Sequence, residues 1–191
     1  LYVDLGITVD GKKIYWAKCN LGATSETDYG DYFAWGEVTG YNEGKTNFAT
    51  DWSNYYFGAY GSFTKYTGSD YDTLEKEDDA AYAALGGKFR MPTSAEIEAL
   101  LTLSKEWVSN YNGSGINGYK FTGNGNTLFL PAAGRRSYTN LYYVGSLGRY
   151  WSSSLSTGYP YYAWLVYFDS GSVFRDYNYR YYGLSVRPVS E

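Results

Sequence analysis

The sequence of 191 residues predicts an α+β domain. Three observations predict this fold class: short segments in which polar and apolar residues alternate, strong turn signals between them, and two segments with helix-capping residues. Because turns or long loops separate the alternating segments, we expect short, mainly antiparallel strands together with two helices. The length favours a single domain over residues 1–191.

Short strands within long loops are expected in the first third of the chain. Residues 2–5 and 14–21 alternate as strands do, and Asp10-Gly11 between them is a turn signal. Residues 29–37 are expected to form a further strand. The following stretch, 39–73, is rich in Gly, Asn, Ser, Asp and Tyr, and is expected to be a long loop with room for small strands or helices.

Two helices are expected in the middle of the chain. Residues 75–85 carry acidic side chains in their first turn and end at Gly86-Gly87, as helix polarity and C-capping favour. The second helix opens after Pro92, where Thr93 and Glu96 have the spacing of a capping box. The acidic cluster at 70–79 lacks the spaced ligands of an EF-hand loop. We therefore interpret it as a solvated helix start and not as a calcium site.

Strands are expected to fill the rest of the chain. The Gly-Asn-Gly-Asn sequence at 123–126 is a hairpin signal between strands at 119–122 and 127–130. Further strands are expected at 149–153, 163–168, 173–176 and 183–189, with a turn at 169–172. In the strand at 163–168, alternation is expected to place Trp164, Val166 and Phe168 in the core and Leu165 and Tyr167 on the opposite face.

Composition and charge argue against two classes of partner. The formal net charge is −4, and no basic stripe is visible, whereas nucleic-acid binding depends on neutralising phosphates. No apolar run approaches the roughly 18 residues that a membrane helix needs, so this segment is not expected to insert into a membrane. The first residues do not form a signal peptide, so an export signal, if the protein has one, is not in this chain.

Histidine is absent, and Cys19 is the single cysteine. This composition excludes Ser-His and Cys-His catalysis, histidine-based metal sites and an internal disulfide. Cys19 is expected to be a buried structural thiol. With the acidic residues gathered at the expected helix start and no convergent polar site, we expect no enzyme, no cofactor and no metal.

Tyrosine is the unusual component of this chain. Of its 25 tyrosines, 12 lie among the last 54 residues and 13 among the first 137. A core has little use for so many phenol hydroxyls, each of which needs a partner when buried, whereas a binding surface uses them readily. Tiling of a sheet surface is the alternative interpretation. It does not account for the loop-borne tyrosines at 142–143 and 159–162, so a binding face is favoured.

Seven segments in order resemble a large family of gut-bacterial surface domains with a C-type-lectin-like fold related to formylglycine-generating enzymes. They are YVDLG (2–6), WAKCNLGA (16–23), DYGDYFAWGE (28–37), GKFRMPT (87–93), LPAAG (130–134), YWSS (150–153) and SVRPV (185–189). The resemblance spans nearly the whole chain and implies a C-type-lectin-like fold: two helices with mainly antiparallel short strands and long loops.

The C-terminal part is also similar to the variable proteins of diversity-generating retroelements, in which error-prone copying of template adenines turns Asn codons into codons for Tyr, Asp, Ser, Leu, Phe or Arg. The resemblance implies a variable ligand-binding region at 135–182, in which Asn140 and Asn178 are template residues left unchanged. The implied ligand-binding positions are Tyr138, Tyr142, Tyr143, Leu147, Arg149, Gly158, Tyr159, Tyr161, Tyr162, Leu165, Tyr167, Asp169, Phe174, Asp176, Tyr177, Tyr179, Tyr181 and Tyr182.

The resemblance implies a receptor- or adhesin-type module that is secreted, displayed on a bacterial surface or carried by a phage particle. Its expected partner is a protein or cell-surface ligand; the alternative is a calcium-independent carbohydrate-binding module that uses exposed aromatic residues. Related activities do not carry over. Formylglycine-generating enzymes use a pair of cysteines, which one cysteine cannot supply, and no proline here lies in the Glu-Pro-Asn or Gln-Pro-Asp motif of calcium-dependent lectins.

The retroelement resemblance makes a prediction about the flanking DNA. A near-identical template repeat should carry adenine-containing codons opposite the positions given above. The codons that should match the template are those for Trp151, Trp164, Val166, Phe168 and Val186. Sequencing of the neighbouring DNA, with a search for a reverse transcriptase gene, checks this expectation. Differences spread evenly over scaffold and face codons would contradict it.

Overall fold

The computed structural model describes residues 2–41 and 49–191 and confirms the α+β class. Its described helices are α1 (Ala80–Leu85) and α2 (Ser94–Leu101), with 3-10 turns at η1 (Lys76–Asp78) and η2 (Tyr111–Gly113). The strand pairs within its sheets are antiparallel. Among the described residues, no helix is long and apolar enough to cross a membrane.

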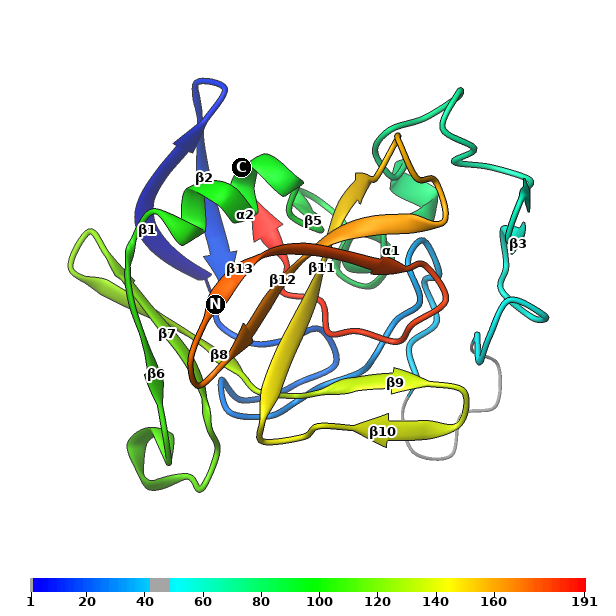
Figure 1. Cartoon of the computed structure of the whole chain (residues 1–191). Helices are drawn as coiled ribbons and strands as arrows, with labels where there is room; N and C mark the ends of the chain where they lie inside the picture. Colours follow the sequence, from blue (N-terminus) through cyan, green and yellow to red (C-terminus); the bar gives the residue numbers. More distant parts are fainter. Residues whose placement is uncertain (1, 42–48) are drawn as a thin grey trace.

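A four-stranded sheet brings the two ends of the chain together (Figure 1). Its strands, in spatial order, are β1 (Tyr2–Val9), β2 (Lys12–Ala17), β14 (Val189–Ser190) and β5 (Phe89–Arg90). The predicted turn between the first two strands is confirmed, since Asp10 and Gly11 both have positive φ, 51° and 76°. Two consecutive positive φ values suit a tight hairpin because their twist matches that of the strands.

A second, three-stranded sheet consists of β6 (Ser104–Val108), β7 (Gly118–Gly123) and β8 (Asn126–Pro131). The predicted hairpin between β7 and β8 is confirmed, with Asn124 and Gly125 at φ 52° and 73°. The sequence did not reveal β6, because its largely exposed residues show no clear alternation of buried and exposed positions. Pairing with β7 defines that strand.

The central sheet consists of β11 (Leu147–Leu155), β12 (Tyr162–Asp169) and β13 (Val173–Tyr179). Both faces of its middle strand contribute buried residues. Leu165 belongs to one hydrophobic cluster, whereas Val166 and Phe168 belong to a second one together with Ile97 and Leu100 of α2.

This two-sided burial corrects the expected faces of β12. Val166 and Phe168 are core residues, as predicted, but Leu165, which was expected on the exposed ligand-binding face, is fully buried (0%). Trp164 is only half-buried, so its placement in the core was wrong. Alternation in sequence assigns residues to the two faces of a strand. It does not tell which positions are exposed when other elements pack against both faces.

The two helices differ from expectation only where the first begins. α1 starts at Ala80 and not at residue 75, because the Asp79 carboxylate caps it, accepting from the backbone N–H groups of Ala81 (2.9 Å) and Tyr82 (3.0 Å). Its predicted stop at Gly86 is confirmed by a φ of 63°. For α2, both hydrogen bonds of the capping box between Thr93 and Glu96 are present.

Two predicted strands do not form. Residues 29–37 make only isolated bridges, and residues 183–188 likewise lie buried as irregular chain. The reason is that the second segment bonds to several different neighbours. Leu184 exchanges backbone hydrogen bonds with Phe33, Ser185 bonds to Arg149 and Trp151, and Val186 bonds to Leu21.

The predicted long loop at 39–73 holds one small hairpin, β3 (Gly58–Ala59) and β4 (Ser62–Phe63), while its residues 42–48 lie outside the described part of the chain. A second hairpin, β9 (Arg135–Ser137) and β10 (Asn140–Tyr142), was not predicted. Cys19 is half-buried, so the expectation of a fully buried thiol was wrong.

Two fully buried arginines hold irregular segments in place. Arg187 donates to Asn20 Oδ1 from Nε (2.9 Å) and Nη2 (2.7 Å), and from Nη1 to the carbonyls of Ala17 (3.2 Å) and Lys18 (3.0 Å). Burial lowers the pKa of Arg187. Because burying a charge without hydrogen bonds is costly, this set of acceptors is what allows the cation to sit in the core.

Arg180 links the 39–73 loop to the turn between β11 and β12. Its Nη1 donates to the carbonyls of Tyr66 (2.7 Å) and Pro160 (2.8 Å), its Nη2 to Lys65 O (3.1 Å), and its Nε to Tyr55 Oη (3.1 Å). The guanidinium carbon also lies 4.1 Å from the centre of the Phe63 ring.

Replacing Arg180 should therefore unfold more than one loop. Arg180→Met keeps most of the apolar stem but leaves three buried carbonyl groups without a donor. The free energy of unfolding should fall by about 3–5 kcal/mol. Urea unfolding followed by tryptophan fluorescence measures this loss.

Lys12→Met is the control, because Lys12 is an exposed residue whose ammonium group pairs with Glu191 at the surface (2.8 Å). Surface ion pairs contribute about 0–1 kcal/mol, so its effect should be small. Equal stability losses in the two variants would show that Arg180 does not cross-link these segments.

Candidate ligand-binding surface

Aromatic rings from distant parts of the chain form a contiguous surface at one end of the central sheet. Neighbouring ring centroids within it lie between 4.5 and 6.5 Å apart. We define the aromatic surface as Trp52, Tyr60, Tyr138, Tyr159, Tyr161, Tyr162, Trp164, Tyr177, Tyr179, Tyr181 and Tyr182.

Strand register positions the centre of this surface. On β12 and β13, Tyr162 lies opposite Tyr179, and Trp164 lies opposite Tyr177. Residues directly opposite each other on antiparallel strands share a face of the sheet, so these four rings lie side by side. The rings of Tyr162 and Tyr177 are 4.9 Å apart, and those of Tyr162 and Tyr179 are 5.1 Å apart.

The rings differ in how far they reach solvent. Tyr138 (55%), Tyr159 (54%) and Tyr177 (41%) are exposed, whereas Tyr181 is buried (6%). Tyr181 stacks on Tyr179 with an interplanar angle of 9° and belongs to the core. Its expected position on an exposed surface was therefore wrong, because the ring supports the surface from below.

The sequence missed two members of this surface. Trp52 contacts Tyr179 (5.8 Å) and Tyr181 (4.9 Å), and Tyr60 contacts Tyr161 (4.7 Å). Both lie in the long loop at 39–73, whose sequence carries no local signal that it folds against β13. Their large aromatic side chains in a polar loop were the only available hint.

A second group of predicted residues lies on the other face of the central sheet. Tyr167 pairs with Arg149 on β11 and with Phe174 on β13. The predicted ligand-binding tyrosines therefore do not all share one exposed surface, because Tyr167 and Tyr177 lie on opposite faces of the sheet and Tyr181 is buried. We define the arginine patch as Arg135, Tyr142, Tyr143, Arg149, Tyr167 and Phe174.

Tyr182 connects the two groups. Its ring contacts Tyr179 (5.9 Å) and Tyr181 (4.9 Å) on one side, and the Arg135 guanidinium carbon lies 4.6 Å from its centre on the other. The aromatic surface and the arginine patch are therefore contiguous at this ring.

The remaining predicted positions show where substitution is tolerated. Leu147 is buried at 9%, so its placement on a ligand-facing surface was wrong, as it was for Leu165. Asp169 and Asp176 are half-buried, and Gly158 is exposed. A Cβ added to Gly158 would meet no atom within 4 Å, so this turn accepts any side chain.

Asp169 has a structural role at the turn between β12 and β13. Its Oδ1 accepts from the backbone N–H groups of Gly171 (2.8 Å) and Ser172 (2.9 Å), and its Oδ2 accepts from the Tyr167 hydroxyl (2.8 Å). The Tyr167 hydrogen bond is the main cause that lowers the pKa of Asp169. A charged carboxylate thus holds the Tyr167 ring in its orientation.

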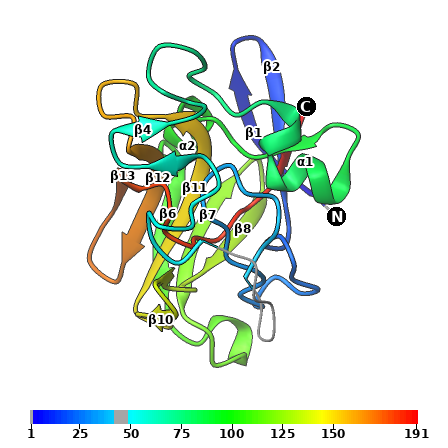
Figure 2. The same cartoon turned by 90° about the vertical axis from the view of Figure 1, so that its right-hand side faces the viewer.

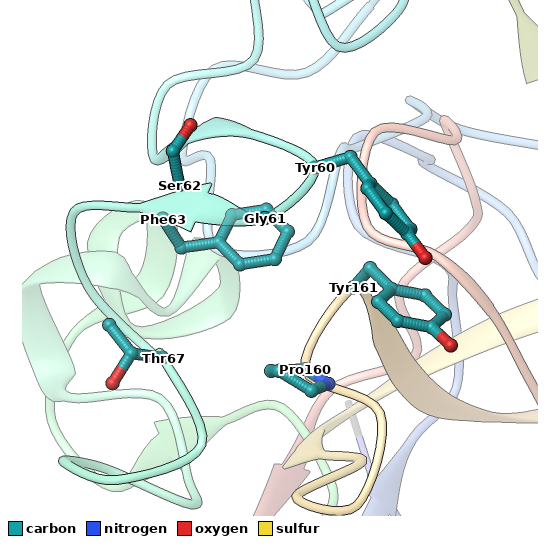
Figure 3. A pocket seen from close by; sticks show the side chains of 7 residues that line it. All are labelled: Tyr60, Gly61, Ser62, Phe63, Thr67, Pro160 and Tyr161. Atoms are coloured by element: carbon teal, nitrogen blue, oxygen red, sulfur yellow. The ribbon is translucent and has the colours of Figure 1, made fainter.

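A cleft of about 330 Å³ opens beside the aromatic surface, between the β3–β4 hairpin and the turn before β12 (Figure 3). Figure 2 views the molecule from the side on which this hairpin lies, with β4 drawn in front of the central sheet. The cleft is lined by Tyr60, Gly61, Ser62, Phe63, Thr67, Pro160 and Tyr161. The rings of Tyr60 and Tyr161 are inclined by only 35°, so they offer adjoining faces to a ligand.

The pKa of Tyr162 is raised to about 12 by burial and then by the hydrogen bond with Tyr179, so its phenol group is uncharged at neutral pH. A tyrosine side chain offers an apolar ring face and a hydroxyl that both donates and accepts hydrogen bonds.

The acidic cluster does not form a solvated helix start. The carboxylates of Glu75, Glu77 and Asp78 converge, and the Lys65 Nζ lies 2.5, 3.3 and 2.6 Å from their oxygens. Three converging carboxylates could hold a cation, and here the ammonium group of Lys65 occupies their centre. Asp78 also accepts from the buried Tyr66 hydroxyl (2.6 Å), so the cluster anchors the loop that Arg180 holds.

Comparison with known proteins finds one family. A family model described as a domain of unknown function (DUF8237) matches residues 104–189. The match covers the arginine patch and most of the aromatic surface, but not Trp52 or Tyr60. Searches of curated proteins and of solved structures give no significant match.

Proposed function

We propose that this chain is a ligand-binding module of the receptor or adhesin type, with a C-type-lectin-like fold, and not an enzyme. Its ligand would be a protein or another component of a cell surface. The module would act outside the cell, on a bacterial surface or on a phage particle. The combination of two short helices, antiparallel strands and long loops supports the fold assignment.

The observation that carries this proposal is the contiguous aromatic surface. Tyrosine provides a large, rigid contact area with a polar tip, and it loses little conformational entropy on binding. Contiguous exposed apolar area of this kind usually marks an interaction site on a soluble domain. The ring contacts between Tyr159, Tyr161, Tyr162 and Tyr177 make it one continuous area.

The placement of the predicted variable positions also supports a diversified surface. All of them except Leu147, Leu165 and Tyr181 are at least partly exposed. Exposed residues such as Tyr138, Tyr143 and Phe174 can change without disturbing the core. The central sheet beneath is buried on both faces and supplies a rigid platform for such changes.

Removing two exposed rings should abolish binding and spare the fold. We expect the double variant Tyr159→Ser/Tyr177→Ser to lose at least about tenfold in cell binding, because hot-spot tyrosines each contribute about 2 kcal/mol or more. Its free energy of unfolding should change by only about 0.5–1 kcal/mol. Flow cytometry of labelled protein on a panel of bacterial and mammalian cells, with parallel urea unfolding, gives both values.

Two control variants separate binding from folding. Tyr2→Ser removes a ring that is exposed to the same extent as Tyr159 (54%) but lies on β1, so binding should persist. Leu165→Ala should lower the free energy of unfolding by about 2–5 kcal/mol through a core cavity. The proposal fails if no cell binds, or if the tyrosine double variant and Tyr2→Ser lose binding equally.

The cleft beside the surface favours carbohydrate binding as a second candidate function. Aromatic rings and hydroxyls line this cleft, and sugars stack on ring faces while their hydroxyls form hydrogen bonds. A glycan array should then give signals that survive a calcium chelator and disappear in Tyr60→Ala/Tyr161→Ala. An array without signal, or a signal unaffected by that variant, would exclude the cleft as a sugar site.

A further inference from the structure

Two arginines of the arginine patch lie close together on adjacent strands. Arg135 begins β9 and Arg149 belongs to β11. Gly134 and Gly148, which precede the two arginines in the chain, lie side by side because they form a parallel bridge. The backbone N–H of Gly134 donates to Leu147 O at 2.8 Å, which fixes this junction. Both arginine side chains are half-buried and therefore remain partly open to solvent.

These two guanidinium groups contact aromatic rings, and no described residue accepts a hydrogen bond from their buried donors. Arg135 lies over Tyr142 (5.2 Å), Tyr143 (5.7 Å) and Tyr182 (4.6 Å), and Arg149 lies over Tyr167 (5.4 Å). Within the described part of the chain, Nε and Nη1 of Arg135 and Nε of Arg149 are buried without a hydrogen-bond partner. Buried donors without acceptors are costly, and native structures normally avoid them.

The structural arginines of the same molecule show the contrast. The guanidinium groups of Arg180 and Arg187 each donate four hydrogen bonds, and that of Arg90 forms a two-pronged pair with the Glu96 carboxylate (2.8 and 2.6 Å). Arg135 and Arg149, by contrast, combine half-exposure with buried donors that no described residue accepts. These two arginines are therefore not explained by the requirements of folding.

The charges around the pair also favour an incoming anion. Burial lowers the pKa of Arg149, and the positive charge of Arg135 lowers it further, whereas Asp176, Tyr167 and Tyr182 raise it. Among the described residues, no carboxylate forms an ion pair with Arg135 or Arg149. The net charge of the chain is −4, so this local positive site stands out on an acidic protein.

We infer that Arg135 and Arg149 form an anion site that binds the carboxylate of an Asp or Glu side chain on a protein partner. The inference rests on the proposed binding function and specifies the chemistry that its ligand must supply. The guanidinium fork matches a carboxylate in a two-pronged geometry, and the planar groups keep their stacking on the tyrosine rings. Tyr143 and Phe174, exposed at 54% and 44%, would contact the apolar residues beside the acid.

Selection of random peptides displayed on phage tests this site without knowledge of the natural ligand. Peptides enriched on the wild-type protein should contain Asp or Glu next to an aromatic or aliphatic residue. Their affinity should fall at least about tenfold for Arg135→Gln/Arg149→Gln, since truncating one partner of a desolvated charge pair is strongly felt. The control Lys18→Gln/Lys88→Gln removes two exposed charges elsewhere and should keep the affinity.

The outcomes separate this inference from the proposed function. Enriched peptides that lack acidic residues, or acidic peptides that bind the arginine double variant equally well, would overturn the anion site while leaving a binding module. If no peptide is enriched, or if enriched peptides bind wild type and both double variants equally well, both proposals fail. An array of uronate- and sialate-containing glycans distinguishes the source of the carboxylate: binding there, with no acidic peptide, would contradict a protein partner.

Stability gives an independent readout of the unsatisfied donors. Arg149→Met removes a cation that the fold does not satisfy, so the Tm of the free protein should rise, by roughly 2–4 °C, even as the affinity for acidic peptides falls. Thermal unfolding of wild type and variant measures this shift. A lower Tm for Arg149→Met would mean that the guanidinium stabilises the unliganded fold, and this would contradict its assignment to a ligand site.

Discussion

The buried guanidinium of Arg180 is the interaction on which the candidate binding surface depends. Its four hydrogen bonds join residues 55–66 to Pro160, and so bring a long loop of the first third against the turn before β12. Trp52 and Tyr60 reach the tyrosines of the C-terminal third only because that loop is fixed there. Without this cross-link, the loop has little regular structure of its own, since β3 and β4 contain two residues each.

The central sheet imposes the second constraint. A hydrophobic cluster packs against each of its faces and buries Ala163, Leu165, Val166 and Phe168 of the middle strand. Side chains of the candidate surface therefore come from the remaining positions of the sheet and from the connecting turns. This arrangement separates tolerance to change from stability: rings at the periphery can vary, whereas Leu165 and Phe168 cannot.

The arginines divide in the same way. Arg187 and Arg180 are satisfied by carbonyl, amide and phenol oxygens and serve the fold, whereas Arg135 and Arg149 have aromatic neighbours and lack acceptors. A folded protein normally satisfies its buried donors. Buried donors without acceptors lower the stability of the unliganded protein. Such a loss of stability, beside an exposed aromatic area, is typical of a site that is organised to bind a ligand.

Sequence alone determined the features that depend on neighbouring residues. Asp10-Gly11 and Asn124-Gly125 specify tight hairpins because they accept positive φ, and Thr93 with Glu96 specifies the start of α2 because their groups satisfy its first N–H donors. The excess of tyrosine after residue 138 likewise pointed to the C-terminal third as the binding region.

Tertiary structure decided which side of each segment meets solvent and which distant residues meet. Leu165 is buried and Trp164 is half-exposed because other elements pack against both faces of the sheet. Odd- and even-numbered positions of the strand therefore both include buried residues. Residues 183–188 are irregular because their hydrogen bonds go to several separate segments. The arginine patch and the contribution of Trp52 arise from contacts between residues far apart in the chain. No local pattern encodes such contacts.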